Sequence, residues 1–485
     1  MQSYAPTARE ICILGALLWL LLLFTGSFKE STLSVTEVAQ LRSSQLLGKV
    51  EQEPVALTYE EQFSLQSLHA PLLWGKGEVP QTEIVAHVPG WTMFDRLYFK
   101  NGTFYVVTED PTDIPPLNLI ISSGIFLTSG PTDELKRLPT DKDMRIIDTA
   151  EARKLFGDRA QRLDGVTWLA NDPKQFITHY YHWSAELFFG FWRAYSSLDP
   201  SIPPSGRTNL PAPRRFMFTH LDAANWRDYA AMNQWVMLSA FPSITMEFMD
   251  DWWERGNMTQ TFVFDRVLLA DRAAAIHGHI FLRTQRTAAN AFALPGSVHW
   301  WQPIRNRVVN AAGLREFTYA NYGERVPVIT YISRQGWGRR MLIQEHHEKL
   351  VRELYQLRDD HGYEVNVVNM DKLTRAEQMI LSGRTTIMMG VHGNGLTSLL
   401  WMQPTPRSTV MEFFFPGGFA HDYEYTTRAL GMVHYGFWGD SAFTRPNVPP
   451  VAYPEGFQGN EIPIDGALVA RLCVERLMLS EEADD

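Results

Sequence analysis

The sequence predicts an α/β fold that contains a parallel sheet with helices on its faces. The prediction comes from residues 326–415, where short β-branched runs alternate with helical stretches. Such alternation is typical of βαβ units, whose strands run parallel. A content of 45% hydrophobic and only 20% charged residues also indicates a packed body, because such a chain can bury enough apolar surface to offset its ordering entropy.

The first part of this region predicts a strand, a helix, a strand and a second helix. Residues 326–332 form a β-branched run, and leucines at helical spacing predict a helix over 342–357. A strand follows over 363–368. Thr374 and Glu377 then have the spacing of a capping box, in which the hydroxyl and the carboxylate satisfy the free N–H groups that open a helix.

The second part predicts a strand, a glycine-rich loop, a short helix and a final strand. The strand covers 385–389 and the loop covers 390–395, while the helix is expected over 396–402 and the last strand over 409–414. Ligands of parallel sheets bind at the carboxyl ends of the strands. The loop therefore lies at the expected ligand position.

The preceding part of the body is harder to interpret. Residues 80–315 mix short apolar runs with aromatic-rich helical stretches, and the clearest strands are 215–219 and 261–264. The proline-rich segment 201–215 is typical of a surface loop. No internal repeat is found in the sequence.

Charge and cysteine content argue against a nucleic-acid-binding protein and against a body stabilised by disulfides. Lys and Arg number 44 against 54 Asp and Glu, so the net charge of −10 argues against a protein that binds nucleic acid by neutralising phosphates. The two cysteines are Cys12, inside an apolar N-terminal stretch, and Cys473. No disulfide is therefore expected in the body.

The N-terminus predicts transfer across a membrane. Residues 11–28 reach the lower end of the roughly 17–25 residues that span a bilayer as a helix. This favours a signal anchor between a cytosolic tail, 1–10, and a polar stem, 29–75. A cleaved signal peptide, which would release a secreted protein, is the alternative. Asn101 and Asn257 each begin a glycosylation triplet, which agrees with either interpretation.

The glycine-rich loop is a candidate phosphate site. Gly393 and Gly395 let a ligand approach the backbone, and the N–H groups of Leu396 and Thr397 open the following helix. His392 can donate a hydrogen bond to a phosphate oxygen. The alternative is a tight strand-to-helix turn that needs glycine for its torsion angles.

The loop after the first strand adds positive charge at the same predicted edge. Arg334, Arg339 and Arg340 are expected beside His392, where guanidinium groups would neutralise a diphosphate. A solvated basic loop is the alternative. Glu412 interrupts the last apolar strand, and a buried carboxylate there needs partners such as the hydroxyls of a ribose. Glu412 could instead face solvent at the strand end.

An upstream segment offers a candidate base. His182 and Glu186 are four residues apart and would share one face of a helix, where a His–carboxylate pair can act as general base. A core histidine is the alternative. Asp141 and Asp143 spell a DxD motif, but they lie in a polar turn with no strand leading into it, so no metal site is expected there.

These motifs together resemble glycosyltransferase family 61, and specifically its fungal members. The resemblance covers about 163–430 and consists of a Tyr-His-Trp run followed by a carboxylate, Ser-Arg followed by an arginine pair, HGxGLT before a short apolar helix and a proline, and a strand with a glutamate. Four positions depart from the family pattern: Asn394 where Ala is usual, Ser398 and Gln344 where Asn is usual, and His179 where Asn often precedes the Tyr-His-Trp run.

The resemblance implies a GT-B-like architecture, a pair of Rossmann-like domains whose parallel sheets face a cleft. The acceptor-side domain would cover 76–320, the domain that binds the nucleotide sugar 321–445, and a C-terminal tail 446–485. It further implies a single-pass type II protein of the Golgi or endoplasmic reticulum membrane with a lumenal body.

The implied activity is an inverting transfer of a hexose or pentose from a nucleotide sugar, with UDP as the expected nucleotide, to a hydroxyl of a glycan or glycoprotein. The implied roles fall into three groups. The diphosphate would be lined by His392, Gly393, Asn394, Gly395, Leu396 and Thr397 and neutralised by Arg334 and Arg340. Glu412 would hold the ribose, and His182 and Glu186 would face the acceptor. No cofactor is required by these motifs, and dependence on a divalent metal stays open.

Two other functions stay open. The departures around His179 and Asn394 fit an inactive lumenal carbohydrate-binding protein of the same fold. The run from His392 to Gly395 also resembles the oxyanion loop of esterases, for which Ser441 in the segment 439–443 would be the nucleophile; the second glycine of a G-x-S-x-G elbow is missing there.

Overall fold

The computed structural model of the protein describes residues 70–128, 131–314 and 326–480. The predicted cytosolic tail, the predicted anchor and the predicted stem up to residue 69 lie outside these residues. Within the described ranges, no helix has both the length and the apolar character needed to cross a bilayer. All described residues belong to one compact unit, Leu68–Asp485.

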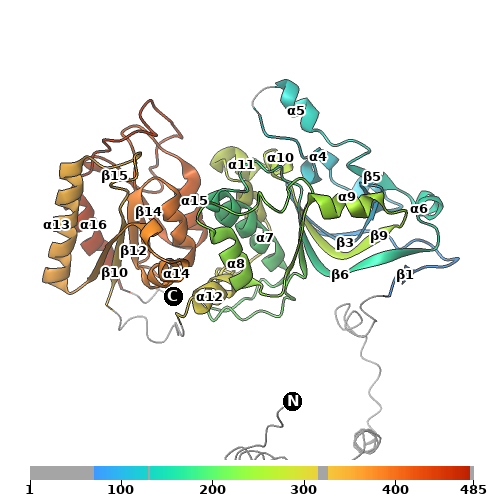
Figure 1. The fold of residues 1–485 in the computed structure, drawn as a ribbon, viewed down its shortest axis with the longest axis horizontal. Coiled ribbons are helices and arrows are strands. Elements are labelled where there is room, and N and C mark those ends of the chain that lie inside the picture. Colours follow the sequence, from blue (N-terminus) through green and yellow to red (C-terminus); the bar gives the residue numbers. More distant parts are fainter. Residues whose placement is uncertain (1–69, 129–130, 315–325, 481–485) are drawn as a thin grey trace, which may run out of the picture. The chain divides into compact units, whose positions relative to one another are not determined.

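The C-terminal half is built on a six-stranded sheet in the order β11-β10-β12-β13-β14-β15 (Figure 1). Its strands are β10 (Val328–Ile332), β11 (Glu364–Val368), β12 (Ile387–Val391), β13 (Thr409–Phe413), β14 (Val433–Trp438) and β15 (Ser441–Phe443). The first five are parallel and β15 is antiparallel to β14. In chain order the parallel strands run 2-1-3-4-5, which places a topological switch point between β10 and β12.

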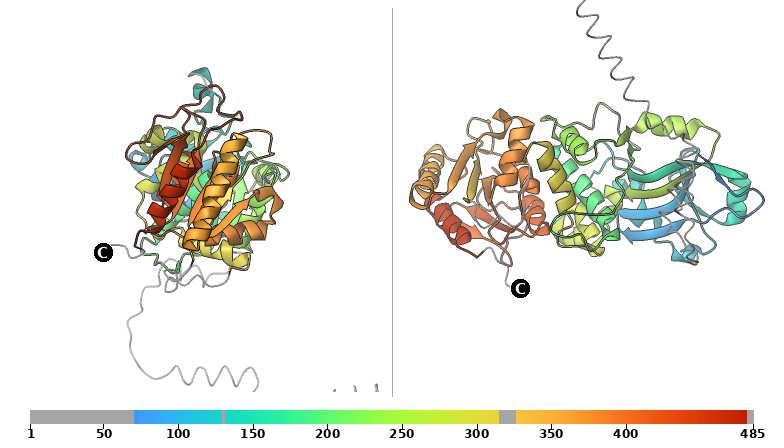
Figure 2. Two further views of the ribbon diagram at one scale, coloured as in Figure 1. Left: turned by 90° about the vertical axis from the view of Figure 1, so that its left-hand side faces the viewer. Right: turned by 90° about the horizontal axis from the view of Figure 1, so that it is seen from below.

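Helices cover both faces of this sheet, as the sequence predicts. They are α13 (Gln344–His361), α14 (Arg375–Arg384), η7 (Asn394–Trp401), α15 (His421–Ala429) and α16 (Gly466–Leu477). Helices α13 and α16 lie side by side on one face (Figure 2) and share a core with it. The segment expected as a C-terminal tail therefore contributes the buried residues Val469 and Cys473 to this core.

The N-terminal half has a nine-stranded sheet in the order β5-β4-β3-β9-β6-β7-β8, with β1 on β6 and β2 on β3. Its strands are β1 (Leu72–Leu73), β2 (Glu83–Val88), β3 (Trp91–Lys100), β4 (Thr103–Val107), β5 (Met144–Ile147), β6 (Arg159–Ala170), β7 (Arg215–Phe218), β8 (Thr245–Glu247) and β9 (Phe262–Ala270). Strands β9, β6, β7 and β8 are mutually parallel, whereas β3 is antiparallel to β2, β4 and β9.

We refer to this N-terminal sheet as the first sheet and to the six-stranded C-terminal sheet as the second. The first sheet is mixed, whereas a parallel sheet is expected from the sequence. The antiparallel part includes the hairpin of β3 and β4, whose two-residue turn is Asn101-Gly102 with φ angles of 51° and 82°. Asn-Gly is a strong signal for such a turn, because both central residues need positive φ. The same pair also begins the glycosylation triplet Asn101-Gly102-Thr103, the only signal for which it is considered above.

A helical layer packs between the two sheets (Figures 1 and 2). It contains η2 (His182–Phe188), α7 (Phe189–Tyr195), α8 (Met232–Ala240), α11 (His279–Thr284), η4 (Thr287–Ala293) and α12 (Gln302–Ala311). The other helices are η1 (Pro111–Asp113), α4 (Leu117–Ile120), α5 (Pro131–Arg137), α6 (Thr149–Phe156), η3 (Ser196–Leu198), α9 (Met249–Asn257), α10 (Arg272–Ala275) and η6 (Met370–Lys372).

Two predicted helix starts have different outcomes. The capping box at α14 is confirmed, because Thr374 Oγ1 accepts from Glu377 N at 3.3 Å and Glu377 Oε2 accepts from Thr374 N at 2.8 Å. The helix after the glycine-rich loop begins at Asn394 instead of Leu396 and is a 3-10 helix. The loop is correspondingly shorter than expected.

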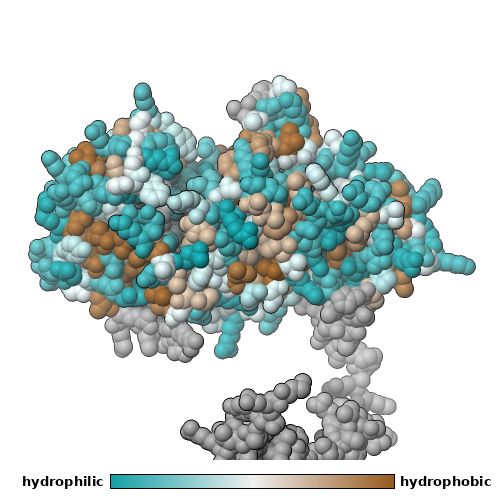
Figure 3. Space-filling view, viewed as in Figure 1, coloured by the Kyte–Doolittle hydropathy of each residue, from teal (hydrophilic) through white to brown (hydrophobic). Residues whose placement is uncertain are grey.

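One apolar core joins the helical layer to the second sheet. Buried side chains from η2, α7, α8 and α12 cluster with buried side chains of η7, β12 and β13. The two halves of the body therefore share their interior. On the face shown in Figure 3, hydrophilic residues dominate the surface and apolar residues form separate groups.

Arg305 on α12 fixes this junction. It is fully buried, its Nε donates to Trp401 O and Met402 O at 3.0 Å each, and its Nη2 donates to Gly383 O at 3.1 Å. A buried guanidinium thus satisfies carbonyl groups where η7 and α14 end.

We expect Arg305→Ala to lower the free energy of unfolding by about 3 kcal/mol or more, because it leaves these buried carbonyls without donors. Denaturant unfolding measures the change. Arg471→Ala on α16 is the control, since Arg471 is exposed and its replacement should cost less than about 0.5 kcal/mol. Equal stability of the two variants would contradict the role of Arg305.

Candidate functional site

The switch point of the second sheet brings the predicted loops together. The chain leaves β10 through Arg334 and leaves β12 through His392, and the two strands are parallel neighbours. Arg340 Nη1 donates to His392 O at 3.0 Å. A Cβ atom on Gly393 would lie only 2.7 Å from Arg334 Nη1. A glycine at this position therefore lets the guanidinium of Arg334 lie against the loop backbone.

Arg334 and Arg340 form a cationic pair without a counter-charge. Both are half-buried, and neither has a carboxylate within ion-pair distance among the residues that the structure describes. The Nε atoms of both are buried without a hydrogen-bond partner in that part of the chain. Burial and the charge of Arg340 lower the pKa of Arg334 to about 10, and burial lowers the pKa of Arg340. An anion bound here would relieve both effects.

The start of η7 supplies backbone donors beside these arginines. Because η7 begins at Asn394, the N–H groups of Asn394 and Gly395 have no carbonyl partner within the helix, while Leu396 N donates to Gly393 O at 2.9 Å. The donors expected at Leu396 and Thr397 thus shift two residues toward the N-terminus. They remain at the switch point.

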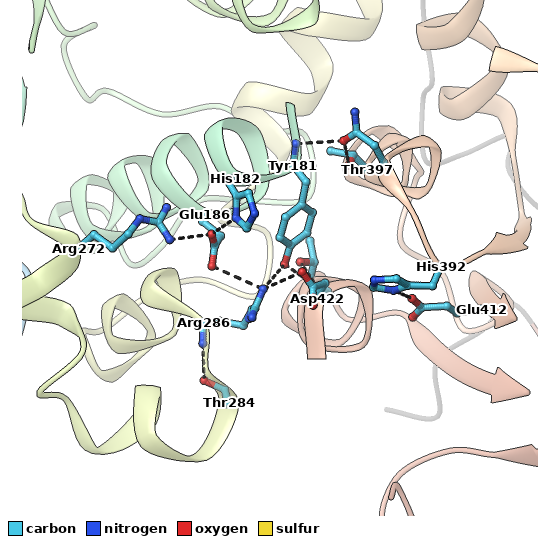
Figure 4. Close-up of polar contacts among 12 residues, drawn as sticks. Tyr181, His182, Glu186, Arg272, Thr284, Arg286, His392, Thr397, Glu412 and Asp422 are labelled. Carbon is cyan, nitrogen blue, oxygen red and sulfur yellow. Dashed lines mark hydrogen bonds and ion pairs between the residues drawn. The ribbon is translucent and has the colours of Figure 1, made fainter. Parts of the chain in front are cut away.

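Asn394 connects the loop to the N-terminal half. Its Oδ1 accepts from Tyr181 N and from Thr397 Oγ1, both at 3.2 Å (Figure 4). Tyr181 directly precedes His182. The structure therefore places the predicted base next to the glycine-rich loop, although 210 residues separate His182 from His392 in the sequence.

His182 and Glu186 form the predicted pair, with 2.6 Å between His182 Nδ1 and Glu186 Oε2. The helix that carries them, η2, is a π-helix and not the α-helix that the spacing suggests. Single π-helical turns occur frequently at functional sites. Glu186 is 2% exposed, whereas the His182 side chain is 25% exposed.

Two arginines hold Glu186 as a carboxylate. Arg272 Nη1 lies 2.8 Å from Oε2, and Arg286 Nη1 lies 3.7 Å from Oε1. Burial would raise the pKa of Glu186, but the charges of Arg272, His182 and Arg286 outweigh it and hold this pKa well below its usual range. Glu186 therefore orients the imidazole through Nδ1–H, and His182 Nε2 is left as the nitrogen that can take a proton.

Arg286 also contacts the C-terminal half. Its Nη1 lies 2.8 Å from Asp422 Oδ1 on α15, and Tyr181 Oη donates to Asp422 O at 2.9 Å (Figure 4). Sequence analysis missed Arg272, Arg286 and Asp422. Their partners lie 86 or more residues away along the chain, so no local spacing marks them.

Glu412 lies at the end of β13 with both oxygens engaged. It is fully buried, and it accepts from His392 Nδ1 at 2.5 Å and from His434 Nε2 at 2.8 Å. The structure therefore assigns Glu412 the orientation of His392. The contact with a ribose that the resemblance implies stays a prediction.

Other sequence motifs lie elsewhere. Asp143 Oδ2 accepts from Thr140 N and closes a turn before β5, and the described residues contain no group of three His, Cys, Asp or Glu side chains that could hold a metal. Ser441 lies in the hairpin of β14 and β15 and donates to Trp438 O at 3.0 Å. A nucleophile elbow joins a strand to a helix, so Ser441 lacks its context. The acceptors Asn101 and Asn257 are both exposed, and their glycosylation stays a prediction.

Comparison with known proteins identifies one family. The model described as Glycosyltransferase 61 matches residues 180–411. This span contains the His182–Glu186 pair, the glycine-rich loop and the loop after β10 that carries Arg334 and Arg340. No curated protein matches the chain.

We expect Glu186→Gln to destabilise the protein by about 3 kcal/mol at neutral pH, because Arg272 and Arg286 lose their shared counter-charge. Glu186 has a depressed pKa in the folded state, so its contribution is complete above the ordinary carboxyl pKa of 4.5 and is lost as the pH falls through the folded value. Denaturant unfolding at several pH values should show a constant difference from wild type down to about pH 5 and a smaller one below.

The matched control is Glu475→Gln on α16, where the carboxylate is exposed. This substitution should change stability by less than about 0.5 kcal/mol at every pH. A difference between wild type and Glu186→Gln that grows toward low pH would contradict the ionised carboxylate.

Proposed function

Residues 180–411 make this chain a member of glycosyltransferase family 61, and from this premise we propose that it moves a hexose or pentose from a UDP-sugar to a hydroxyl of a glycan or glycoprotein with inversion at the anomeric carbon. The single observation that carries the donor site is the uncompensated pair Arg334 and Arg340 beside Gly393 at the switch point. Two half-buried cations and open backbone N–H groups suit a diphosphate.

The proposed reaction is a direct displacement. His182 Nε2 accepts the proton of the acceptor hydroxyl, and the hydroxyl oxygen forms a bond to the anomeric carbon. The bond from that carbon to the diphosphate oxygen breaks, and UDP leaves with the electron pair. Arg334, Arg340 and the start of η7 stabilise the charge that develops on the leaving diphosphate.

No metal is needed for this scheme, because the two guanidinium groups supply the neutralising charge. Glu186 keeps His182 in the tautomer that presents Nε2, which is the role of the carboxylate in a His–carboxylate pair. The donor and base groups come from opposite halves of the body and are connected through Asn394 and Tyr181.

The proposed architecture is GT-B. Strands β6 and β9 of the first sheet are parallel, η2 follows β6 in the chain, and Arg272 lies two residues after the end of β9. The base and its arginine thus come from the carboxyl end of the first sheet, while the donor groups come from the carboxyl end of the second. We further propose a lumenal body in the Golgi or endoplasmic reticulum, supported by the apolar segment 11–28 and by the exposed acceptors Asn101 and Asn257.

A screen of nucleotide sugars against glycan acceptors tests this function directly. Released UDP is measured with and without a chelator, and the anomeric configuration of the product is determined by NMR. We expect turnover with a UDP-sugar, retained in chelator, and an inverted product. UDP binding without turnover of any donor would favour an inactive carbohydrate-binding protein, and full loss in chelator restored by manganese would contradict the role of the arginines.

We expect Arg334→Ala and Arg340→Ala each to weaken UDP binding by about 10- to 100-fold, since charge-assisted hydrogen bonds contribute roughly 1.5–3 kcal/mol. Calorimetric titration with UDP measures the change. Arg339→Ala is the matched control, because Arg339 lies in the same loop but is exposed. An equal loss of affinity in all three variants would show only a general charge effect.

We expect His182→Ala to lower kcat by about 100- to 10,000-fold while UDP binding is unchanged, because the imidazole acts on the acceptor and not on the diphosphate. Steady-state kinetics and UDP titration separate the two effects. His361→Ala at the exposed end of α13 serves as control. A loss of UDP affinity with unchanged kcat would place His182 on the donor side.

A further inference from the structure

We propose that the pocket between the turn at Tyr229, the loop after β10, η6 and the start of η7 holds the nucleobase of the donor, with Trp337 and Tyr229 as the residues that stack on it. This inference rests on the proposed function, because it names how the same donor is oriented and selected. The pocket has a volume of about 150 Å³ and is lined by Tyr229, Trp337, Arg334, Gln378 and Asn394, among other residues.

Trp337 is presented to the pocket by an unusual turn. It lies between Gly336 and Gly338, which have φ angles of 88° and 92°, and its own side chain is 45% exposed. The guanidinium of Arg334 lies 5.8 Å from the centre of its ring. An indole that packs into no core, beside the arginine that is proposed to bind the diphosphate, is suited to stack on a base.

Tyr229 reaches the same pocket from the N-terminal half and is 95% exposed. Its backbone is nevertheless fixed. The buried Asp228 accepts from Ala230 N at 3.1 Å and from Asn233 N at 2.8 Å, and Ala231 adopts a positive φ of 59°. The turn therefore presents a large aromatic side chain at the pocket, where a ligand can cover the ring.

Two amide side chains in the pocket have defined orientations. Asn394 Oδ1 accepts two hydrogen bonds, which leaves Nδ2 as its donor. Gln378 Nε2 donates to Met370 O at 2.8 Å and to Leu373 O at 3.1 Å, which leaves Oε1 as its acceptor. A donor and an acceptor match the carbonyl oxygens and the N3–H group of uracil. Asn394 is also one of the four positions where this chain departs from the family pattern.

The position of the pocket favours the base over the acceptor sugar. Arg334 lines it, so it continues directly from the proposed diphosphate site, whereas His182 is not among its lining residues. In a nucleotide sugar the base and the transferred sugar lie at opposite ends of the diphosphate. The base end therefore belongs in the pocket and the sugar end beside His182.

Calorimetric titration of the full-length protein with UDP and with inorganic pyrophosphate tests the proposal. We expect Trp337→Ala to weaken UDP binding about tenfold or more while pyrophosphate binding is unchanged, and Trp337→Phe to retain most of the affinity, because an aromatic ring still stacks. Tyr229→Ala should weaken UDP binding in the same selective way. Trp253→Ala, which removes an exposed indole from α9, is the control and should bind like wild type.

The outcomes separate this inference from the function on which it rests. If wild type binds no UDP, the proposed donor and its base pocket are both wrong. If wild type binds UDP and Trp337→Ala binds it equally well, only the base pocket is wrong. A variant that keeps UDP affinity but loses affinity for a glycan acceptor would assign the pocket to the acceptor and overturn the inference. Thermal unfolding of each variant shows whether the fold is intact.

Discussion

The placement of Arg334 and Arg340 without a carboxylate is the constraint on which the proposed donor site depends. Elsewhere in the described body, the half-buried arginines Arg162 and Arg266 have carboxylate partners, and the fully buried Arg305 donates to backbone carbonyls. At the switch point, two guanidinium groups are forced together against the backbone of Gly393. An anion bound at this site would offset the cost of burying two like charges together.

The His182–Glu186 pair, which is the proposed base, differs from the arginine pair in that its buried charge is compensated. Glu186 is deeply buried, but the charges of Arg272 and Arg286 compensate its charge, and His182 Nδ1 donates a hydrogen bond to it. These contacts keep the carboxylate ionised and orient the imidazole, so the nitrogen proposed to take the proton is positioned by the protein alone. The hydrogen bond from Tyr181 N to Asn394 Oδ1 connects the segment that carries His182 and Glu186 to the loop beside Arg334 and Arg340. The shared core of the two halves then keeps this short connection in register.

The sequence predicts the second sheet well because its pattern is local. Leucine spacing marks α13, and the capping box at Thr374 marks the start of α14. It predicts the first sheet poorly, because the antiparallel strands around the Asn101-Gly102 hairpin depend on pairing between distant segments.

The same distinction applies to the site. The HGxGLT motif and the i, i+4 spacing identify His392 and His182 from the sequence. No spacing connects Arg272, Arg286 or Asp422 to Glu186 and Tyr181, and only the fold brings them together. A crystal structure of the protein with UDP tests the central claim most directly. The account predicts the diphosphate between Arg334, Arg340 and the start of η7, and a diphosphate bound away from β10 and β12 would contradict it.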